Sequence, residues 1–143
     1  MKHFLLILFF PLVAFAQTAP IEGNWTLTDR SCNSGARPHD GFVLDRDSWQ
    51  ISFNQGRYDS SREIMDCSYW SRGDYRARGN VLELDHLVGA SNCTNQVPYP
   101  HVSVFFTLAE DVLKIYTNNN TYDSTCPIGD VLESVFNRDR KLD

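Results

Sequence analysis

The sequence predicts an all-β protein: a single eight-stranded antiparallel up-and-down barrel that carries two disulfides. Apolar residues recur at every second position through much of the chain, which is typical of strands with one buried face. Turn signals recur about every ten residues, as in all-β folds. The four cysteines are an even number, which is typical of an exported fold that is linked by disulfides.

Residues 1–16 are predicted to be a cleavable signal peptide. A short basic start precedes an apolar run, Phe4–Phe15, and the small residues Ala14 and Ala16 form an A-x-A-like site for cleavage before Gln17. The run is shorter than the roughly 20 residues that span a bilayer. We therefore expect the protein to be exported, to the periplasm or to the extracellular space.

The remaining residues, 17–143, are few enough to form one domain. The full chain carries a net charge of −5, and residues 17–143 contain two lysines, Lys114 and Lys141. This acidic balance argues against a nucleic-acid partner. No later stretch is apolar enough to span a membrane, and we expect a monomer without a cofactor or a bound metal.

Three strands are expected in the first half of the chain. The first covers residues 21–27, where four alternate residues share one face. The second covers residues 49–53 and ends at an Asn-Gln-Gly turn signal. The third lies within residues 62–70, where bulky side chains occupy both faces, so its inward face stays open.

The clearest hairpin joins residues 74–79 to residues 81–88. A two-residue glycine–asparagine turn of the primed type connects them, because its backbone twist matches that of the strands. This register places Arg76 opposite Glu83 on the outer face, where we expect an exposed cross-strand ion pair.

Residues 101–108 and 112–117 are predicted to form a second hairpin, with Phe106 opposite Ile115. Residues 131–138 form the eighth strand. If consecutive strands alternate in direction, the tight turns fall at one end of the barrel and the long connections at the other.

All four cysteines are expected at the end with the long connections. Cys32, Cys93 and Cys126 lie in those connections, and Cys67 lies in the same half of the third strand. We favour the pairs Cys32–Cys67 and Cys93–Cys126, because the first long loop can fold over the barrel towards the third strand. The alternative joins Cys32 to Cys126 and Cys67 to Cys93, and spacing alone does not decide between them.

The motif Gly23-x-Trp25 near the start of the first strand, with Arg138 at the end of the last, resembles the pattern of lipocalins and other calycins. The resemblance implies that Trp25 packs across the closed end of the barrel and that Arg138 lies over its ring. It also implies that residues 17–143 form a lipocalin-like barrel and that the long first loop covers its other end. The chain lacks the later aspartate-containing motif and the C-terminal helix of typical lipocalins.

A ligand site would lie in the mouth of the barrel. His86 shares an apolar face with Leu82, Leu84 and Val88, so it would point inward near Tyr75, either as a polar handle for a ligand or as a hydrogen-bonded core residue. Aromatic side chains, with Trp70 or Tyr69 as a further member, would line a cavity or fill the barrel. The candidate ligand-binding residues are Trp49, Phe53, Tyr75, His86 and Phe106.

Two other patterns are weaker. Arginines concentrate in the middle of the chain and form either a solvated face or a patch for an anionic partner. His39, Asp40, Asp45 and Asp47 gather in the first long loop, but they lack the spacing of an EF-hand calcium loop.

No nucleophile, acid–base pair or nucleotide-binding motif is present in the sequence, so we do not expect an enzyme. Two functions stay open. The first is a binding protein that holds a small apolar or amphipathic molecule in the barrel mouth. The second is an exported interaction module, such as a hydrolase inhibitor, with a filled barrel and a loop end stiffened by disulfides that contacts an extracytoplasmic protein.

Overall fold

The structure, a computed structural model, describes residues 20–39, 41–94, 100–118 and 126–139. The predicted signal peptide, residues 1–16, lies outside the described residues. Within these ranges there is no helix, and hence none long and apolar enough to cross a membrane.

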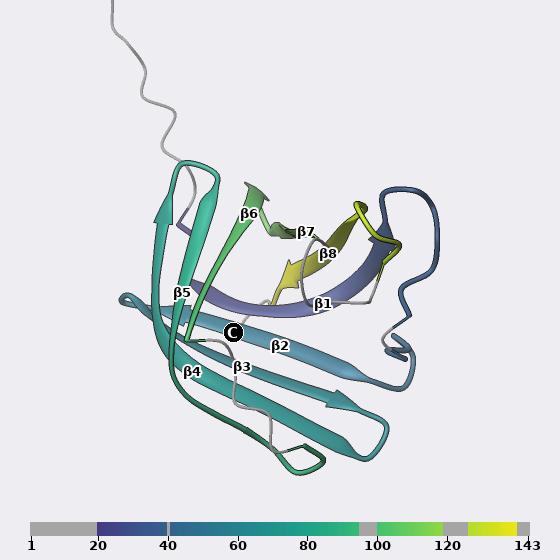
Figure 1. The fold of residues 1–143 in the computed structure, drawn as a ribbon. Helices are drawn as coiled ribbons and strands as arrows, with labels where there is room; N and C mark the ends of the chain where they lie inside the picture. The colour runs from purple at the N-terminus through teal and green to yellow at the C-terminus, as the bar shows by residue number, and fades with distance from the viewer. Residues whose placement is uncertain (1–19, 40, 95–99, 119–125, 140–143) are drawn as a thin grey trace, which may run out of the picture.

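Eight antiparallel strands close into one barrel, so the predicted fold class is confirmed (Figure 1). Each strand pairs with the next along the chain, and the last pairs with the first. The strands are β1 Gly23–Cys32, β2 Ser48–Asn54, β3 Arg57–Ile64, β4 Cys67–Arg78, β5 Val81–Ser91, β6 His101–Ala109, β7 Val112–Asn118 and β8 Val131–Arg138.

The prediction of one strand within residues 62–70 is wrong. This segment contains the end of β3, a turn at Met65 and Asp66, and the start of β4, because Ile64 lies opposite Cys67. β4 then continues to Arg78, so the strand predicted at 74–79 is the second half of a longer one. The predicted total of eight strands is still right, because two errors cancel: β3 was missed, and β4 was predicted as two strands.

The two predicted hairpins have the expected registers. Tyr75 lies opposite Leu84 in β4 and β5, and Phe106 lies opposite Ile115 in β6 and β7. Arg76 also lies opposite Glu83, but its guanidinium pairs with the carboxylate of Asp85 on the same outer face (Nη2–Oδ2 3.2 Å). The predicted Arg76–Glu83 ion pair is therefore replaced by a diagonal one.

The barrel has a tight end and a loop end, as the strand directions predict. Two-residue turns join β2 to β3, β4 to β5 and β6 to β7 at the tight end. The longer connections, from β1 to β2, from β5 to β6 and from β7 to β8, lie at the loop end. The two-residue turn from β3 to β4 also lies there, so the tight turns are not confined to one end as expected. Cys32 ends β1 and Cys67 begins β4, so both lie at the loop end as expected.

The favoured disulfide pairing is wrong, and the alternative is the one observed: Cys32 bonds Cys126 and Cys67 bonds Cys93. Each bridge lies at the loop end, beside a pair of neighbouring strands. Cys32 lies opposite Leu132 of β8, so the β7–β8 connection that carries Cys126 passes close to it. Cys67 begins β4, whose neighbour β5 ends just before Cys93.

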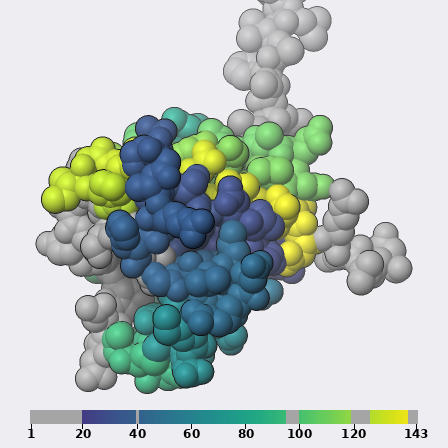
Figure 2. Space-filling model, turned by 90° about the vertical axis from the view of Figure 1, so that its right-hand side faces the viewer, coloured from purple at the N-terminus to yellow at the C-terminus, as the bar shows by residue number. Residues whose placement is uncertain are grey.

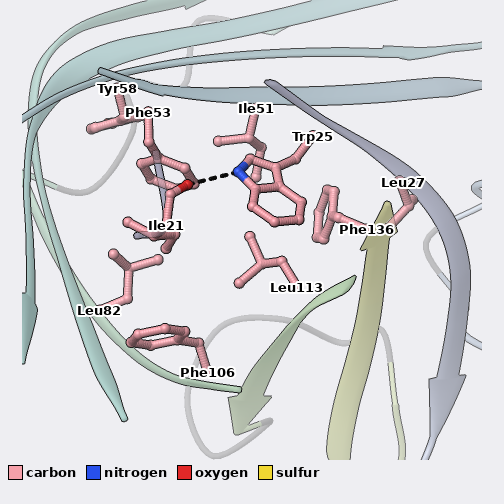
Figure 3. Close-up of a cluster of buried hydrophobic side chains, with 10 residues drawn as sticks. All are labelled: Ile21, Trp25, Leu27, Ile51, Phe53, Tyr58, Leu82, Phe106, Leu113 and Phe136. Atoms are coloured by element: carbon pink, nitrogen blue, oxygen red, sulfur yellow. Dashed lines mark hydrogen bonds between the residues drawn. The ribbon is translucent and has the colours of Figure 1, made fainter. Parts of the chain in front are cut away.

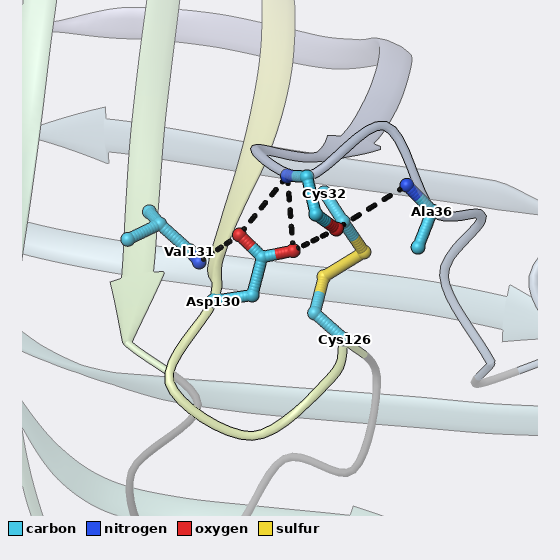
Figure 4. The surroundings of a disulfide bond; sticks show 6 residues. Cys32, Ala36, Cys126, Asp130 and Val131 are labelled. Carbon is cyan, nitrogen blue, oxygen red and sulfur yellow. Dashed lines mark hydrogen bonds between the residues drawn. A yellow bond between two sulfur atoms is a disulfide. The ribbon is translucent and has the colours of Figure 1, made fainter.

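An acidic side chain reinforces the Cys32–Cys126 bridge (Figure 4). The carboxylate of Asp130 accepts hydrogen bonds from the backbone N–H of Val131 (2.8 Å) and of Ser34 (3.1 Å), and from the Ser34 hydroxyl. The Ser34 hydroxyl is the largest cause of a lowered pKa of Asp130. In Figure 2 the dark-blue residues that follow β1 accordingly lie beside the yellow-green residues that follow Cys126.

Side chains fill the tight half of the barrel (Figure 3). Trp25, Leu82, Leu113 and Phe136 have no exposed surface. The complete cluster of buried residues is Ile21, Trp25, Leu27, Ile51, Phe53, Tyr58, Leu82, Phe106, Leu113 and Phe136.

Gly23, Trp25 and Arg138 form one contact at the tight end, as the resemblance to calycins implies. The Arg138 guanidinium lies 4.3 Å from the centre of the Trp25 ring, and the indole N–H donates to the Ile21 carbonyl (2.8 Å). Gly23 has a φ of 136°, and a Cβ there would lie 2.7 Å from the Arg138 Nη1. A side chain at position 23 would therefore displace the guanidinium.

Two irregularities in the strand registers change which side chains face inward. The β1–β8 register shifts between Leu27 and Asp29, so that Arg30 lies opposite the buried Ser134. In the β4–β5 pair the register shifts at Leu87, after which Val88 is 46 % exposed. The expectation that Val88 shares the inward face with His86 is therefore wrong.

Gly73 lies at the second of these irregularities, and we predict that Gly73→Ala lowers the free energy of unfolding by about 1–3 kcal/mol. A Cβ at this position would lie 1.9 Å from the backbone oxygen of Asp85, which cannot rotate away. Urea unfolding of both proteins measures the effect. Ser68→Ala, at an exposed position of the same strand, is the control and should change the free energy by less than about 0.5 kcal/mol. Equal stability of the Gly73 variant and the wild type would contradict the close approach of β4 and β5.

Candidate functional site

The inner face of the barrel becomes polar towards the loop end. Arg62 lies opposite Trp49 in the β2–β3 pair, and side chains directly opposite each other share a face. Arg30 lies opposite Ser134, which is 2 % exposed. We call Arg30, Arg62, Trp49 and Phe42 the arginine–aromatic cluster.

Both guanidiniums of the cluster lie against both of its rings. Arg62 is 5.0 Å from the centre of the Trp49 ring and 5.2 Å from that of Phe42. Arg30 is 5.7 Å and 5.4 Å from the same two rings. Cation–π attraction favours this arrangement, and it orients planar donor groups beside aromatic surface.

Trp49 connects the cluster to the rest of the barrel. Its indole N–H donates to the Ser60 hydroxyl (3.0 Å), and its ring packs edge-on against Phe136 (5.3 Å between centres). Phe136 belongs to the buried cluster of the tight half. Trp49 therefore lies where the filled apolar half gives way to the polar half.

The β1–β2 connection brings Phe42 to the cluster, and Asp47 holds this connection in place. The Asp47 carboxylate is buried and accepts backbone N–H bonds from Val43 (2.6 Å) and from Met65 in the β3–β4 turn (2.9 Å). These bonds hold the pKa of Asp47 below its ordinary value. Of the other acidic or histidine residues predicted to gather here, His39 and Asp45 are exposed, and Asp40 lies outside the described residues.

His86 points inward, as predicted, but towards Tyr58 rather than Tyr75. The Tyr58 hydroxyl and His86 Nδ1 form a hydrogen bond, and the two rings meet edge-on with centres 5.5 Å apart. Burial lowers the pKa of His86 and raises that of Tyr58. The pair is therefore neutral near pH 7, as a hydrogen-bonded pair at the edge of the core requires.

We predict that the neutral state of His86 makes stability depend on pH. Because its pKa is lower in the folded protein than the ordinary 6.5, the unfolded chain binds the proton more tightly. The contribution of His86 to the free energy of unfolding should be fully present above pH 6.5. It should be lost as the pH falls from 6.5 towards the pKa of the folded protein. Urea unfolding between about pH 5 and pH 8 should show a smaller dependence for His86→Gln than for the wild type. His39→Gln, at an exposed position, should leave the dependence unchanged; the same slope in all three proteins would contradict the prediction.

The five candidate ligand residues lie in different parts of the barrel. Phe53 and Phe106 are 1 % and 7 % exposed and belong to the filled core. Tyr75 is half-buried near the tight end, where its ring meets that of Phe53 at 4.9 Å. Trp49 lies in the polar half of the barrel, and His86 is hydrogen-bonded to Tyr58. Trp70, named as a further member, is 43 % exposed on the outer face, whereas Tyr69 is half-buried.

Sequence reasoning missed three inward-facing residues: Arg30, Arg62 and Tyr58. Arg30 turns inward only because of the register shift in β1. Tyr58 and Arg62 belong to β3, which was not recognised because its inward residues include Ser60 and Arg62. The alternation of Tyr58, Ser60, Arg62 and Ile64 was nonetheless a usable signal of a strand with one mixed face.

Arginines on the outer face of the β3–β5 region form ion pairs. The Arg57 Nε lies 3.1 Å from an Asp74 oxygen, and the Arg72 Nε lies 2.5 Å from an Asp59 oxygen. These exposed pairs contribute little to stability. They agree with the solvated-face interpretation for Arg57 and Arg72, whereas Arg62 of the same segment faces inward.

Comparisons with known proteins add nothing to this geometry. No family model matches the chain, and neither the curated proteins nor the solved structures contain a match.

Proposed function

We propose that this protein is an exported, lipocalin-like binding protein that holds a small amphipathic ligand at the loop end of its barrel. The arginine–aromatic cluster carries the proposal. A barrel whose interior serves stability alone is filled with apolar side chains, as the tight half is. Two arginines beside two aromatic rings instead offer hydrogen-bond donors and apolar contact area together, which suits a ligand that has a polar and an apolar part.

The overall architecture supports the same proposal. Eight strands enclose a space that either holds side chains or admits one small ligand. Here the tight half is closed by Trp25, whereas the loop end carries the polar side chains. Trp25 under Arg138, with Gly23 beside them, is also the arrangement that a relationship to lipocalins implies.

Native mass spectrometry of the protein purified from its own source tests the proposal. We expect the wild type to retain a co-purified small molecule, and Arg62→Gln to retain much less of it. Glu63→Gln, the exposed neighbour on β3, is the matched control and should retain as much as the wild type. The proposal would be wrong if the wild-type protein carried no bound molecule, or if all three proteins retained the same amount of it.

A protein-interaction module is the second candidate, favoured by apolar side chains exposed at the loop end. Ile128, two residues after the bridged Cys126, is 97 % exposed, and Met65 in the β3–β4 turn is 65 % exposed. Each lies two residues from a disulfide-bonded cysteine, which would limit the conformational entropy lost on binding a partner. Capture of one defined extracytoplasmic protein by the wild type, and its loss in Ile128→Asp, would favour this candidate.

A further inference from the structure

A groove of about 650 Å³ lies at the tight end of the barrel, opposite the arginine–aromatic cluster. It runs between the segment before β1, the β4–β5 hairpin and the end of β6. Its volume is within the roughly 300–1,000 Å³ that is typical of small-molecule sites. The residues that carry its chemistry are Ile21, Glu22, Tyr75, Ala77, Phe106 and Leu108.

The inner wall of the groove is apolar and belongs to the packed core. Ile21 and Phe106 are 6 % and 7 % exposed and lie on the same side of the buried cluster (Figure 3). Leu108 and Tyr75 pack against that cluster and are half-buried. A ligand in the groove would therefore cover apolar surface that already has a fixed shape.

Hydrogen bonds hold the outer wall in place without a ligand. Arg138 donates from Nη2 to the Pro20 carbonyl (3.1 Å) and from Nη1 to the Glu22 carbonyl. The Trp25 indole donates to the carbonyl of Ile21, and the Tyr75 N–H donates to the Gly56 carbonyl (2.8 Å). The groove is thus preformed, which reduces the entropic cost of binding.

The groove carries negative charge at Glu22. One oxygen of the Glu22 carboxylate accepts from the Gln55 N–H (3.0 Å) and from the Tyr75 hydroxyl (3.4 Å), both of which are neutral donors. Arg76 also lines the groove, but its guanidinium pairs with Asp85 (3.2 Å). Burial, and secondly the Glu22 charge, raise the pKa of the Tyr75 hydroxyl, so this group stays a neutral donor.

We propose that this groove binds an organic ammonium compound with an apolar body. The ammonium lies at the Glu22 carboxylate, beside the ring of Tyr75, and the apolar body lies along Phe106 and Leu108. A carboxylate next to an aromatic ring is suited to such cations, through ionic and cation–π attraction together. The site is separate from the one proposed at the loop end, and neither depends on the other.

Titration calorimetry with decyltrimethylammonium, below its micellar concentration, tests the proposal. We expect one saturable site on the folded protein and at least about tenfold weaker binding to Glu22→Gln, which retains an acceptor for the Gln55 N–H but has no charge. Ala77→Leu, which adds volume at an exposed position of the groove, should weaken binding similarly. Decanoate, which has the same chain length and the opposite charge, should bind at least about tenfold more weakly than the ammonium.

Glu63→Gln, which removes one exposed carboxylate on β3, is the matched control, and its binding should equal that of the wild type. Circular dichroism and thermal unfolding would show that every variant is folded. On the ¹⁵N-labelled protein, the amides of Gly56, Gly79 and Asn80 around the groove should shift on titration. Non-saturable binding, equal affinity for decanoate, or unchanged affinity in both groove variants would overturn the proposal. Arg62→Gln at the other end should bind the ammonium like the wild type; a loss there instead would overturn the assignment to this groove.

Discussion

Replacing Trp25 by alanine is expected to lower the free energy of unfolding by about 3–5 kcal/mol, which is the cost of removing a large aromatic side chain from a packed core. Trp25 has no exposed surface and touches the filled core on one side and the Arg138 guanidinium on the other. Its loss also removes the donor to the Ile21 carbonyl, which orders the segment before β1. Urea unfolding at neutral pH measures the change.

Trp70→Ala is the matched control, since Trp70 is 43 % exposed on the outer face of β4. This change should cost less than about 1 kcal/mol. The loss of stability in Arg138→Ala should lie between those of Trp25→Ala and Trp70→Ala. This change removes a stacking contact and two hydrogen bonds to carbonyls but leaves the core filled. Equal losses for Trp25→Ala and Trp70→Ala would mean that the tight end does not depend on a tryptophan plug.

Removing the Cys32–Cys126 bridge, by changing both cysteines to alanine, is expected to cost about 4–5 kcal/mol in the chain-entropy model. The bridge closes a segment with a sequence separation of 94, which strongly restricts the unfolded chain. The Cys67–Cys93 bridge has a separation of 26, and its removal should cost about 3–4 kcal/mol. Guanidinium unfolding of the two double variants would give the two losses.

The order of the two losses is the decisive measurement. Cys32 and Cys126 are each 3 % exposed, whereas Cys93 is exposed, so lost packing adds to the effect of the first pair. A larger loss on removal of the Cys67–Cys93 bridge would show that the unfolded chain is already compact around β1 and β8. Peptide mapping without reduction should recover the same two pairs.

The fold could be predicted wherever both strands of a pair alternate between apolar and polar residues. The β4–β5 and β6–β7 hairpins satisfy this condition, and their registers are right to the residue. β3 does not, since Ser60 and Arg62 occupy inward positions. The turn from β3 to β4 contains Met65 at a φ of 53°. Because glycine usually takes this conformation and the turn has none, the sequence carried no turn signal here.

The candidate site was harder to predict because it depends on register shifts rather than on composition. The shift after Leu27 turns Arg30 inward, and the one at Leu87 turns Val88 outward. No glycine or proline lies at the shift in β1, and the extra residue of β5 is Leu87, although Gly73 lies opposite it in β4. The pattern of apolar residues therefore continues across both points on the wrong face. The disulfide pairing failed for a related reason: the error in β3 moved Cys67 away from β5, which is its true neighbour.

The Cys32–Cys126 bridge also determines how the molecule would respond to a pulling force. β1 begins and β8 ends at the same end of the barrel, with Trp25 opposite Arg138. Tension on the two termini would therefore separate these strands one residue pair at a time, from that end towards Cys32, which lies opposite Leu132. There the covalent link would carry the load, and the segment between Cys32 and Cys126 would not lengthen. An oxidised molecule should thus extend by the short chain outside the bridge, and a reduced one by nearly its whole length.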